Sequence, residues 1–415
     1  MVTPPEGVAA RRAALKILDS VLRRGQTMDS AAQGTRLPPA DAALAVAIAG
    51  ETLRRLPDLD ALIDGATRQR LPDDSKARMV LRLALAQKTG LGTPDHALVA
   101  TALPLVDGGP RRLVHGVLGA LLRRGVDLPD APALPEAVED RWRDAWGDEV
   151  LQAARRAIGH RPPLDLSFKD DAGAQAYPLG LSLGARHRRV ADAGPVTGLP
   201  GFHSGQWWVQ DLAASLPARL MPAAPADVLD LCAAPGGKTM QLAAAGHRVT
   251  ALDRSQSRLA RLKANLDRTG LAAEMVAADA LDWKSGRQFD AVLLDAPCSA
   301  TGTFRRHPEV LYRARPRIIA DSAELQARLI DHAVTLLKPG GALVYAVCSL
   351  EPVEGENVVT AFLERNPAFR VDPPGPGELP DGVTPAAEGW VRVLPGMLEA
   401  EGGLDGFFVA RFRRD

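Results

Sequence analysis

The sequence predicts three successive parts: an all-α domain, a small α+β region and an α/β domain built on a mixed sheet. Three observations lead to this prediction. Apolar residues recur at helical spacing as far as residue 124, without the alternation typical of strands. A proline-rich stretch at 129–135 interrupts this pattern. From residue 227 onward, short apolar runs alternate with helical segments, as in βαβ units. We therefore expect domains at 1–130, 131–215 and 216–415.

Composition places the chain among folded, soluble proteins. It has 415 residues, of which 46% are hydrophobic and 24% are charged. No apolar run approaches the roughly 18 residues of a membrane span, and we expect no secretory leader because charged residues interrupt the first segment. Three widely spaced cysteines favour a reducing compartment, so we expect a cytoplasmic protein. A formal net charge of zero counts against a strongly basic nucleic-acid binder but leaves room for local basic patches.

The amino-terminal domain is expected to be a helical bundle. The segment at 75–87 is apolar almost all round, which predicts a central helix. Four arginines at 111–112 and 123–124 form either an RNA-facing strip or an ordinary solvated face. The expected helices cover residues 8–24, 41–53, 59–67, 75–87, 94–106 and 111–124.

The connecting region is expected to begin with a helix at 136–159. Trp142 and Trp146 lie four residues apart on one face of it, which favours a place in the core. Short strand-like pieces follow at 164–168 and 207–209, which together predict a small α+β subdomain.

The α/β domain opens with a strand at 227–232, a glycine-rich turn at 233–239 and a helix. Such a turn lets the backbone approach a ligand, and the start of the helix offers free N–H groups. The spacing differs from the phosphate-binding glycine motifs, so a pyrophosphate cofactor is not favoured. Lys238 opposes the dipole of the new helix and requires an anionic partner, either a carboxylate or a substrate phosphate.

Two further strands are expected to end in acids. Asp253 ends the strand at 247–253, where a carboxylate binds ribose hydroxyls in nucleoside-cofactor folds. Asp279, near the end of the strand at 274–280, can accept a hydrogen bond from an adenine amino group. Together with the glycine turn, these acids predict S-adenosylmethionine as cofactor and a Rossmann-like, seven-stranded class I methyltransferase sheet.

Two later strands end close to cysteines. Asp295 ends the strand at 289–295 and is followed at once by Cys298, and an apolar run at 340–347 leads into Cys348. Because ligands bind at the carboxyl ends of the strands in α/β sheets, these side chains are expected to meet at one site. The last strand is expected at 406–412, antiparallel to its neighbour. Arg305 and Arg306 begin an arginine-rich stretch that favours contact with RNA phosphates over a solvated loop.

Several motifs resemble the RsmB/NSUN family of RNA 5-methylcytosine methyltransferases. They are DLCAAPGGKT at 230–239, DAPCS at 295–299 and YAVCS at 345–349. The segments VLRLALAQ at 80–87, PDHALV at 94–99 and VHGVL at 114–118 resemble a NusB-like RNA-binding domain. The resemblance implies that the cofactor is bound by Cys232, Ala233, Ala234, Pro235, Gly236, Gly237, Lys238, Asp253, Asp279 and Asp295.

The resemblance also implies different roles for two of the cysteines. Cys348 is expected to be the nucleophile that adds to carbon 6 of cytosine, and Cys298 to help release the methylated base. Asp295 is expected to contact the cytosine edge or to act as a base, with Lys238 also in the catalytic set. Cys232 is expected to be structural apart from its backbone at the cofactor turn. The sequence predicts no metal site.

The family branch with a NusB-like domain implies 16S ribosomal RNA as substrate, either free or in an early 30S assembly. The alternatives are the same chemistry on transfer RNA or another ribosomal cytosine, and a non-catalytic NusB-like RNA-binding or antitermination factor. A small-molecule methyltransferase would need neither the cysteine pair nor the arginine run. We expect a monomer without an obligate protein partner or membrane association.

Overall fold

The structure is a computed structural model that describes residues 6–414. It divides into two compact units: unit 1 comprises residues 1–161 and 304–314, and unit 2 comprises residues 162–303 and 315–415. This division differs from the expected one. The helix at 136–159 was expected in the connecting region but belongs to unit 1, as does the segment 304–314, which was expected in the α/β domain. The small α+β region belongs to the same unit as the α/β domain.

Unit 1 is all-α, as predicted. Helix α5 is buried without interruption over residues 77–87 and contacts α1, α3, α4, α6 and α7, so it is the central helix. The short helix α2 was not predicted; Thr27 caps its amino terminus by accepting the Ser30 N–H at 3.2 Å. The helices are α1 (Val8–Arg24), α2 (Met28–Gln33), α3 (Pro39–Arg54), α4 (Leu56–Gly65), α5 (Lys76–Gly90), α6 (Asp95–Ala102), α7 (Gly108–Arg124), α8 (Glu136–Gly159) and α13 (Val310–Arg313).

Helix α13 completes unit 1 although it lies far along the chain. The Tyr312 hydroxyl donates to the Leu53 carbonyl at 2.8 Å, and the Met28 N–H donates to Glu309 Oε1 at 3.2 Å. Phe304 meets the buried ring of Trp142 edge-on, with ring centroids 5.2 Å apart. The segment that follows the Cys298 loop is therefore part of the helical core.

Unit 2 begins with the predicted α+β region. Four short strands form an antiparallel sheet in the order β2-β3-β1-β4. Buried Asp165 in β1 accepts two hydrogen bonds from Arg189 in β3, at 2.6 and 2.7 Å, which ties the strands together. The elements are β1 (Leu164–Phe168), α9 (Asp171–Ala176), β2 (Leu181–Ser182), β3 (His187–Val190) and β4 (Trp207–Val209).

The large sheet of unit 2 runs in the order β10-β12-β9-β8-β5-β6-β7, and β11 pairs with β12 beside this path. Strands β7, β6, β5, β8 and β9 are mutually parallel, and β12 is antiparallel to β9. The predicted seven-stranded mixed sheet is confirmed, with β11 as an eighth strand. The strands are β5 (Asp227–Leu231), β6 (Arg248–Asp253), β7 (Glu274–Ala277), β8 (Phe289–Asp295), β9 (Leu337–Val347), β10 (Phe369–Val371), β11 (Val391–Val393) and β12 (Phe407–Arg414).

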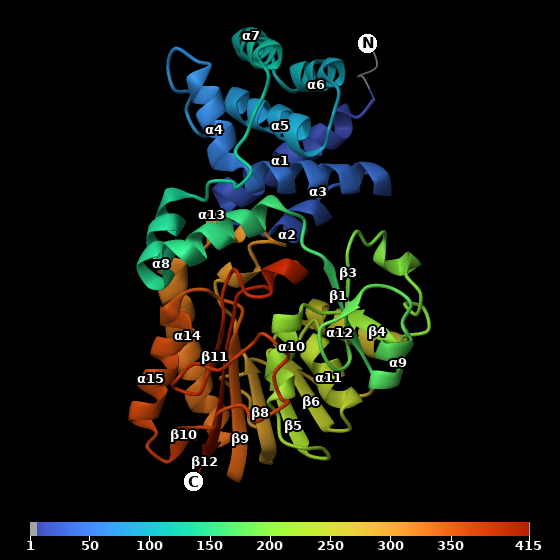
Figure 1. Cartoon of the computed structure of the whole chain (residues 1–415), viewed down its shortest axis with the longest axis vertical. Coiled ribbons are helices and arrows are strands. Elements are labelled where there is room, and N and C mark those ends of the chain that lie inside the picture. The colour runs from blue at the N-terminus through green and yellow to red at the C-terminus, as the bar shows by residue number, and fades with distance from the viewer. Residues whose placement is uncertain (1–5, 415) are drawn as a thin grey trace. The chain divides into compact units, whose positions relative to one another are not determined.

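Helices cover both faces of this sheet (Figure 1). Apolar side chains of α14 (Pro316–Thr335) and α15 (Glu356–Arg365) pack on the face that carries Leu229 and Leu252. Helices α10 (Leu212–Arg219), α11 (Gly237–Ala244) and α12 (Gln256–Thr269) pack on the opposite face. Because the five adjacent strands β9, β8, β5, β6 and β7 are parallel, their carboxyl ends all reach the same edge of the sheet, and the loops gathered there form the site.

Candidate active site

The glycine-rich turn lies between β5 and α11, as predicted. Gly236 has a φ of +105°, and a Cβ added there would lie 2.0 Å from Leu262 Cδ1, so only glycine fits. Cys232 also has a positive φ, of +62°. The Ala233 N–H donates to the Leu252 carbonyl at 3.0 Å, which holds the turn against β6.

Asp230 begins the motif at 230–239, although no separate role was predicted for its side chain. It is fully buried in β5, and its Oδ2 accepts a hydrogen bond from Thr239 Oγ1 at 2.6 Å, whereas its Oδ1 has no partner among the described residues. Burial raises the pKa of Asp230 to about 7, despite the opposing hydrogen bond from Thr239. An acid within an apolar strand just before a glycine turn was the signal available.

A cavity of about 330 Å³ runs along this turn. Its lining includes Asp230, residues 233–238, Asp295 and Trp208. An unpartnered buried carboxylate oxygen, a close backbone turn and apolar walls fit a cofactor that carries an amino group and an apolar body. The residues present therefore fit S-adenosylmethionine.

Asp253 and Asp279 lie at the same edge of the sheet. Buried Asp253 accepts the N–H groups of Ala234 at 3.2 Å and Ser255 at 2.9 Å, so it is tied to the glycine turn. Asp279 is exposed and lies two residues beyond β7, where it accepts the Leu281 N–H at 3.0 Å. Their contacts with ribose and adenine stay predictions.

Lys238 has a carboxylate as its anionic partner. Its Nζ lies 2.7 Å from Asp295 Oδ2 and 5.2 Å from the centroid of the Phe407 ring. Burial acts to lower the pKa of Lys238, but the negative charge of Asp295 outweighs it and the net pKa is raised. Lys238 therefore remains a buried ammonium group within the site.

Cys298 and Cys348 come together as predicted, with their Sγ atoms 3.5 Å apart. Cys348 directly follows β9, and Cys298 lies in the loop after β8, the neighbouring parallel strand. The hydrogen bond with Cys348, followed by burial, raises the pKa of Cys298 well above its usual value. Cys298 thus keeps its proton beside the Cys348 sulfur. Cys232 is outside this pair, and burial raises its pKa to about 12.

The arginines predicted to contact RNA lie in the segment that belongs to unit 1. Arg305 is only 3% exposed and Arg306 is half-buried. The burial of Arg305 does not favour its predicted contact with RNA, and the contact of Arg306 stays a prediction.

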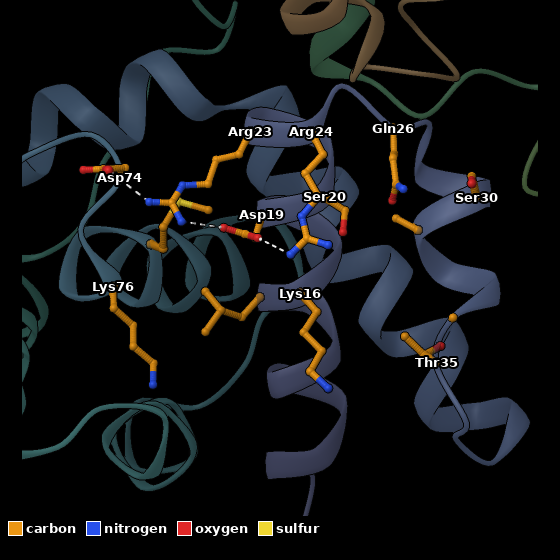
Figure 2. A pocket seen from close by; sticks show the side chains of 14 residues that line it. Lys16, Asp19, Ser20, Arg23, Arg24, Gln26, Ser30, Thr35, Asp74 and Lys76 are labelled. Carbon is orange, nitrogen blue, oxygen red and sulfur yellow. Dashed lines mark hydrogen bonds and ion pairs between the residues drawn. The ribbon is translucent and has the colours of Figure 1, made fainter.

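Unit 1 contains a second cavity, of about 630 Å³, between the end of α1, α2 and the start of α5. Figure 2 shows Arg23 directed at Asp19 and Asp74, at 3.1 and 2.9 Å, and Arg24 directed at Asp19. Exposed Lys16 and Lys76 line the cavity over an apolar floor that includes Met79. The cavity thus combines the ammonium groups of Lys16 and Lys76 with arginine–aspartate ion pairs and an apolar side chain.

Two other properties bear on the class of protein. Within residues 6–414, no group of three or more His, Cys, Asp and Glu side chains is arranged to hold a metal ion. In the same part of the chain, no helix combines the length and apolar character that crossing a membrane requires.

The fold and the site define an S-adenosylmethionine-dependent methyltransferase. Residues 217–413 match the family described as 16S rRNA methyltransferase RsmB/F, and residues 8–124 match the NusB family. The chain is 35% identical to ribosomal RNA small subunit methyltransferase B of Xylella fastidiosa over 99% of both chains. It is 34% identical to the Klebsiella pneumoniae protein of that name over 98% of both chains. The chain belongs to the RsmB/F family of methyltransferases, with a NusB-family domain at its amino terminus.

A solved structure supports the same conclusion. The crystal structure of a methyltransferase homolog protein from Pyrococcus horikoshii matches with a TM-score of 0.55 and 26% identity. The match covers 72% of this chain and 98% of that one.

Proposed function

We propose that this enzyme methylates carbon 5 of a cytosine in 16S ribosomal RNA through a covalent adduct with Cys348. The observation that carries the proposal is the 3.5 Å contact between Cys298 and Cys348 at the site that also holds the Lys238–Asp295 pair. The relatives named ribosomal RNA small subunit methyltransferase B support the RNA substrate.

The chemistry explains why a thiol is required. Carbon 5 of cytosine is a poor nucleophile, and addition of the Cys348 thiolate to carbon 6 makes it electron-rich. S-adenosylmethionine, when bound, supplies the electrophilic methyl group. Loss of the carbon 5 proton then restores the double bond as the bond between carbon 6 and Sγ breaks, and Cys348 leaves as a thiolate.

The neighbouring groups have distinct roles in this sequence of steps. Lys238 carries a positive charge at the site, where burial lowers its pKa but its interactions with Asp295 and other acidic groups together raise it by more. Cys298 retains its proton and donates a hydrogen bond to the Cys348 sulfur as that sulfur leaves carbon 6 as a thiolate, which assists release. Asp295, held by Lys238, contacts the cytosine edge or accepts the carbon 5 proton.

The substrate must bring an unpaired base to this site, because the reacting carbons are inaccessible within a helix. The cavity lined by Lys16 and Lys76 supplies cationic groups for the RNA backbone. We place the reaction in the cytoplasm and assign it to a monomer acting on free 16S RNA or an early 30S assembly.

Methyl transfer from labelled S-adenosylmethionine to 16S RNA tests the proposal. Cys348→Ala abolishes transfer, and Cys298→Ala accumulates an RNA adduct that survives denaturing electrophoresis. Cys232→Ala, the control thiol outside the pair, retains both transfer and turnover. Full activity of Cys348→Ala overturns the nucleophile assignment. Transfer to transfer RNA but not to 16S RNA overturns the substrate assignment.

A further inference from the structure

A buried carboxylate lies behind the two cysteines and has no role in the chemistry described above. Glu354 ends the short helix η4 (Pro352–Glu354) and is 0% exposed. Its Oε1 accepts the Ser299 N–H at 2.8 Å and a hydrogen bond from Gln326 Nε2 at 3.1 Å. Its Oε2 accepts hydrogen bonds from the hydroxyl groups of Ser299 and Ser349.

The partners of Glu354 are the residues that directly follow the two cysteines. Ser299 follows Cys298 and Ser349 follows Cys348, so one side chain joins both loops. The two hydroxyl oxygens lie 3.2 Å from each other. The Gly302 N–H adds a direct link between the loops by donating to the Cys348 carbonyl at 3.0 Å.

The contacts of Glu354 lie beyond the point at which the pairing of β8 with β9 fixes the separation of the two chain segments. The register between β8 and β9 ends with Asp295 opposite Ala346, before either cysteine. Beyond that point, the separation of the loops depends on contacts of the kind that Glu354 makes. Gln326 of α14 extends the support by donating to the Pro297 carbonyl at 2.9 Å.

The energetics favour a specific role for this acid. A carboxylate loses several kcal/mol of hydration on full burial unless hydrogen bonds replace it. Four donors do so here: the N–H and O–H of Ser299, the O–H of Ser349 and the amide of Gln326. Within residues 6–414 no cationic side chain forms an ion pair with Glu354, so its contacts are directed almost entirely at the two loops.

We propose that Glu354 is a positioning residue that holds Cys298 and Cys348 at their reactive separation. The catalytic part of the proposal rests on the proposed function, whereas the geometric part does not. Loss of the carboxylate frees both loops and lowers the fraction of molecules in which the thiol faces the Cys348 sulfur. A misplacement of about 1 Å is enough to cost about 100-fold in rate.

The spacing of the cysteines can be measured without RNA or cofactor. Diamide, an azo oxidant, takes two hydrogens from a pair of adjacent thiols; it is reduced to the hydrazine while the two sulfurs form a disulfide. In the full-length protein, we expect rapid formation of the Cys298–Cys348 disulfide, detected by peptide mass spectrometry. Glu354→Ala slows it at least tenfold. Glu354→Gln restores most of the rate, because its amide can bridge the same two serines.

Activity assays on the same variants complete the test. Glu354→Ala lowers kcat for methyl transfer about 100-fold with KM values for RNA and cofactor unchanged, and Glu354→Gln recovers most of kcat. Glu364→Ala, at an exposed acid on α15, is the matched control and changes neither readout. If Glu354→Ala does not fold, Ser299→Ala and Ser349→Ala remove one hydroxyl each and give intermediate losses.

The outcomes separate the two proposals. An unchanged disulfide rate in Glu354→Ala, or in both serine variants, overturns the positioning role even if activity falls. A slowed disulfide rate combined with a wild-type protein that does not methylate cytosine supports the positioning role and overturns the proposed function.

Discussion

Lys238 Nζ lies 2.7 Å from Asp295 Oδ2, which joins the turn after β5 to the end of β8. The two side chains are 11% and 31% exposed, so the pair sits at the inner end of the site. One residue belongs to the cofactor turn and the other precedes the Cys298 loop. The ion pair therefore ties the glycine-rich turn to the end of the strand that precedes the Cys298 loop.

Replacing Lys238 with methionine keeps most of the apolar stem and removes the charge. We expect kcat for methyl transfer to fall about 100-fold, because the site loses the ammonium group that pairs with Asp295. Single-turnover assays across pH 6 to 9 measure this effect. Lys263→Met, at an exposed lysine on α12, is the control and retains activity. A loss below about threefold contradicts the prediction.

Asp230 makes the stability of the protein depend on pH. Its pKa is raised from 3.8 to about 7, so the native state holds a proton that the unfolded chain releases. The resulting stabilisation is complete below pH 3.8 and is lost as pH rises through 7. Relative to Asp230→Asn, the wild type should lose about 2 to 3 kcal/mol of unfolding free energy between pH 5 and 8. Urea unfolding at the two pH values measures this difference.

The matched control for that experiment is Asp321→Asn, because Asp321 is exposed on α14. Its unfolding free energy should follow the wild type at both pH values. Parallel pH profiles for the wild type and Asp230→Asn would contradict the raised pKa.

Arg78 carries a positive charge on a fully buried side chain of unit 1. Its guanidinium is fully buried and donates to Asp60 at 3.0 Å, to both oxygens of Asp64 at 2.6 and 3.0 Å, and to the Leu71 carbonyl at 3.0 Å. Arg78→Met removes this partner from Asp60 and Asp64, while Arg82 stays bonded to Asp60, so we expect a loss of about 1.5 to 3 kcal/mol in unfolding free energy. Chemical denaturation followed by circular dichroism measures it.

Lys88→Met is the control for Arg78→Met. Lys88 and Asp95 form an exposed pair at 2.6 Å, and such pairs contribute about 1 kcal/mol or less. Equal losses in the two variants would show that burial does not set the contribution of Arg78.

The cavity in unit 1 gives a prediction for RNA binding. The double variant Lys16→Glu and Lys76→Glu should weaken binding of 16S RNA fragments at least tenfold and reduce the salt dependence of the affinity. Each lost phosphate contact lowers the slope of log affinity against log salt by about one. Arg68→Glu changes an exposed arginine outside the cavity and should bind as the wild type does. Equal affinity and slope for the double variant would exclude this surface.

The sheet and the meeting of the two cysteines were predictable because they depend on local patterns. Strand ends at Asp253, Asp295 and Val347 follow from short apolar runs, and parallel strands necessarily bring their carboxyl ends to one edge. Cys298 and Cys348 lie near each other because the strands that precede them, β8 and β9, are neighbours in the sheet.

Other features depend on partners that are distant in sequence. In the sequence, Glu354 resembles an ordinary acidic residue of a loop. In the structure it is buried, and it is held there by hydrogen bonds from Ser299, Ser349 and Gln326. Arg305 reads as a solvated or RNA-binding arginine but is buried in unit 1. No local pattern in the sequence shows that the segment 304–314, which follows the Cys298 loop, belongs to unit 1.

The segment 304–314, which belongs to unit 1, affects the order in which the protein folds during synthesis. Helices α1 to α8 emerge from the ribosome first, yet their core lacks Phe304, Val310 and Leu311, which are buried in the finished unit. The amino-terminal unit therefore cannot reach its final packing until synthesis has passed residue 314, when strands β5 to β8 of the large sheet have already been made. A product truncated before residue 304 therefore lacks part of the helical core.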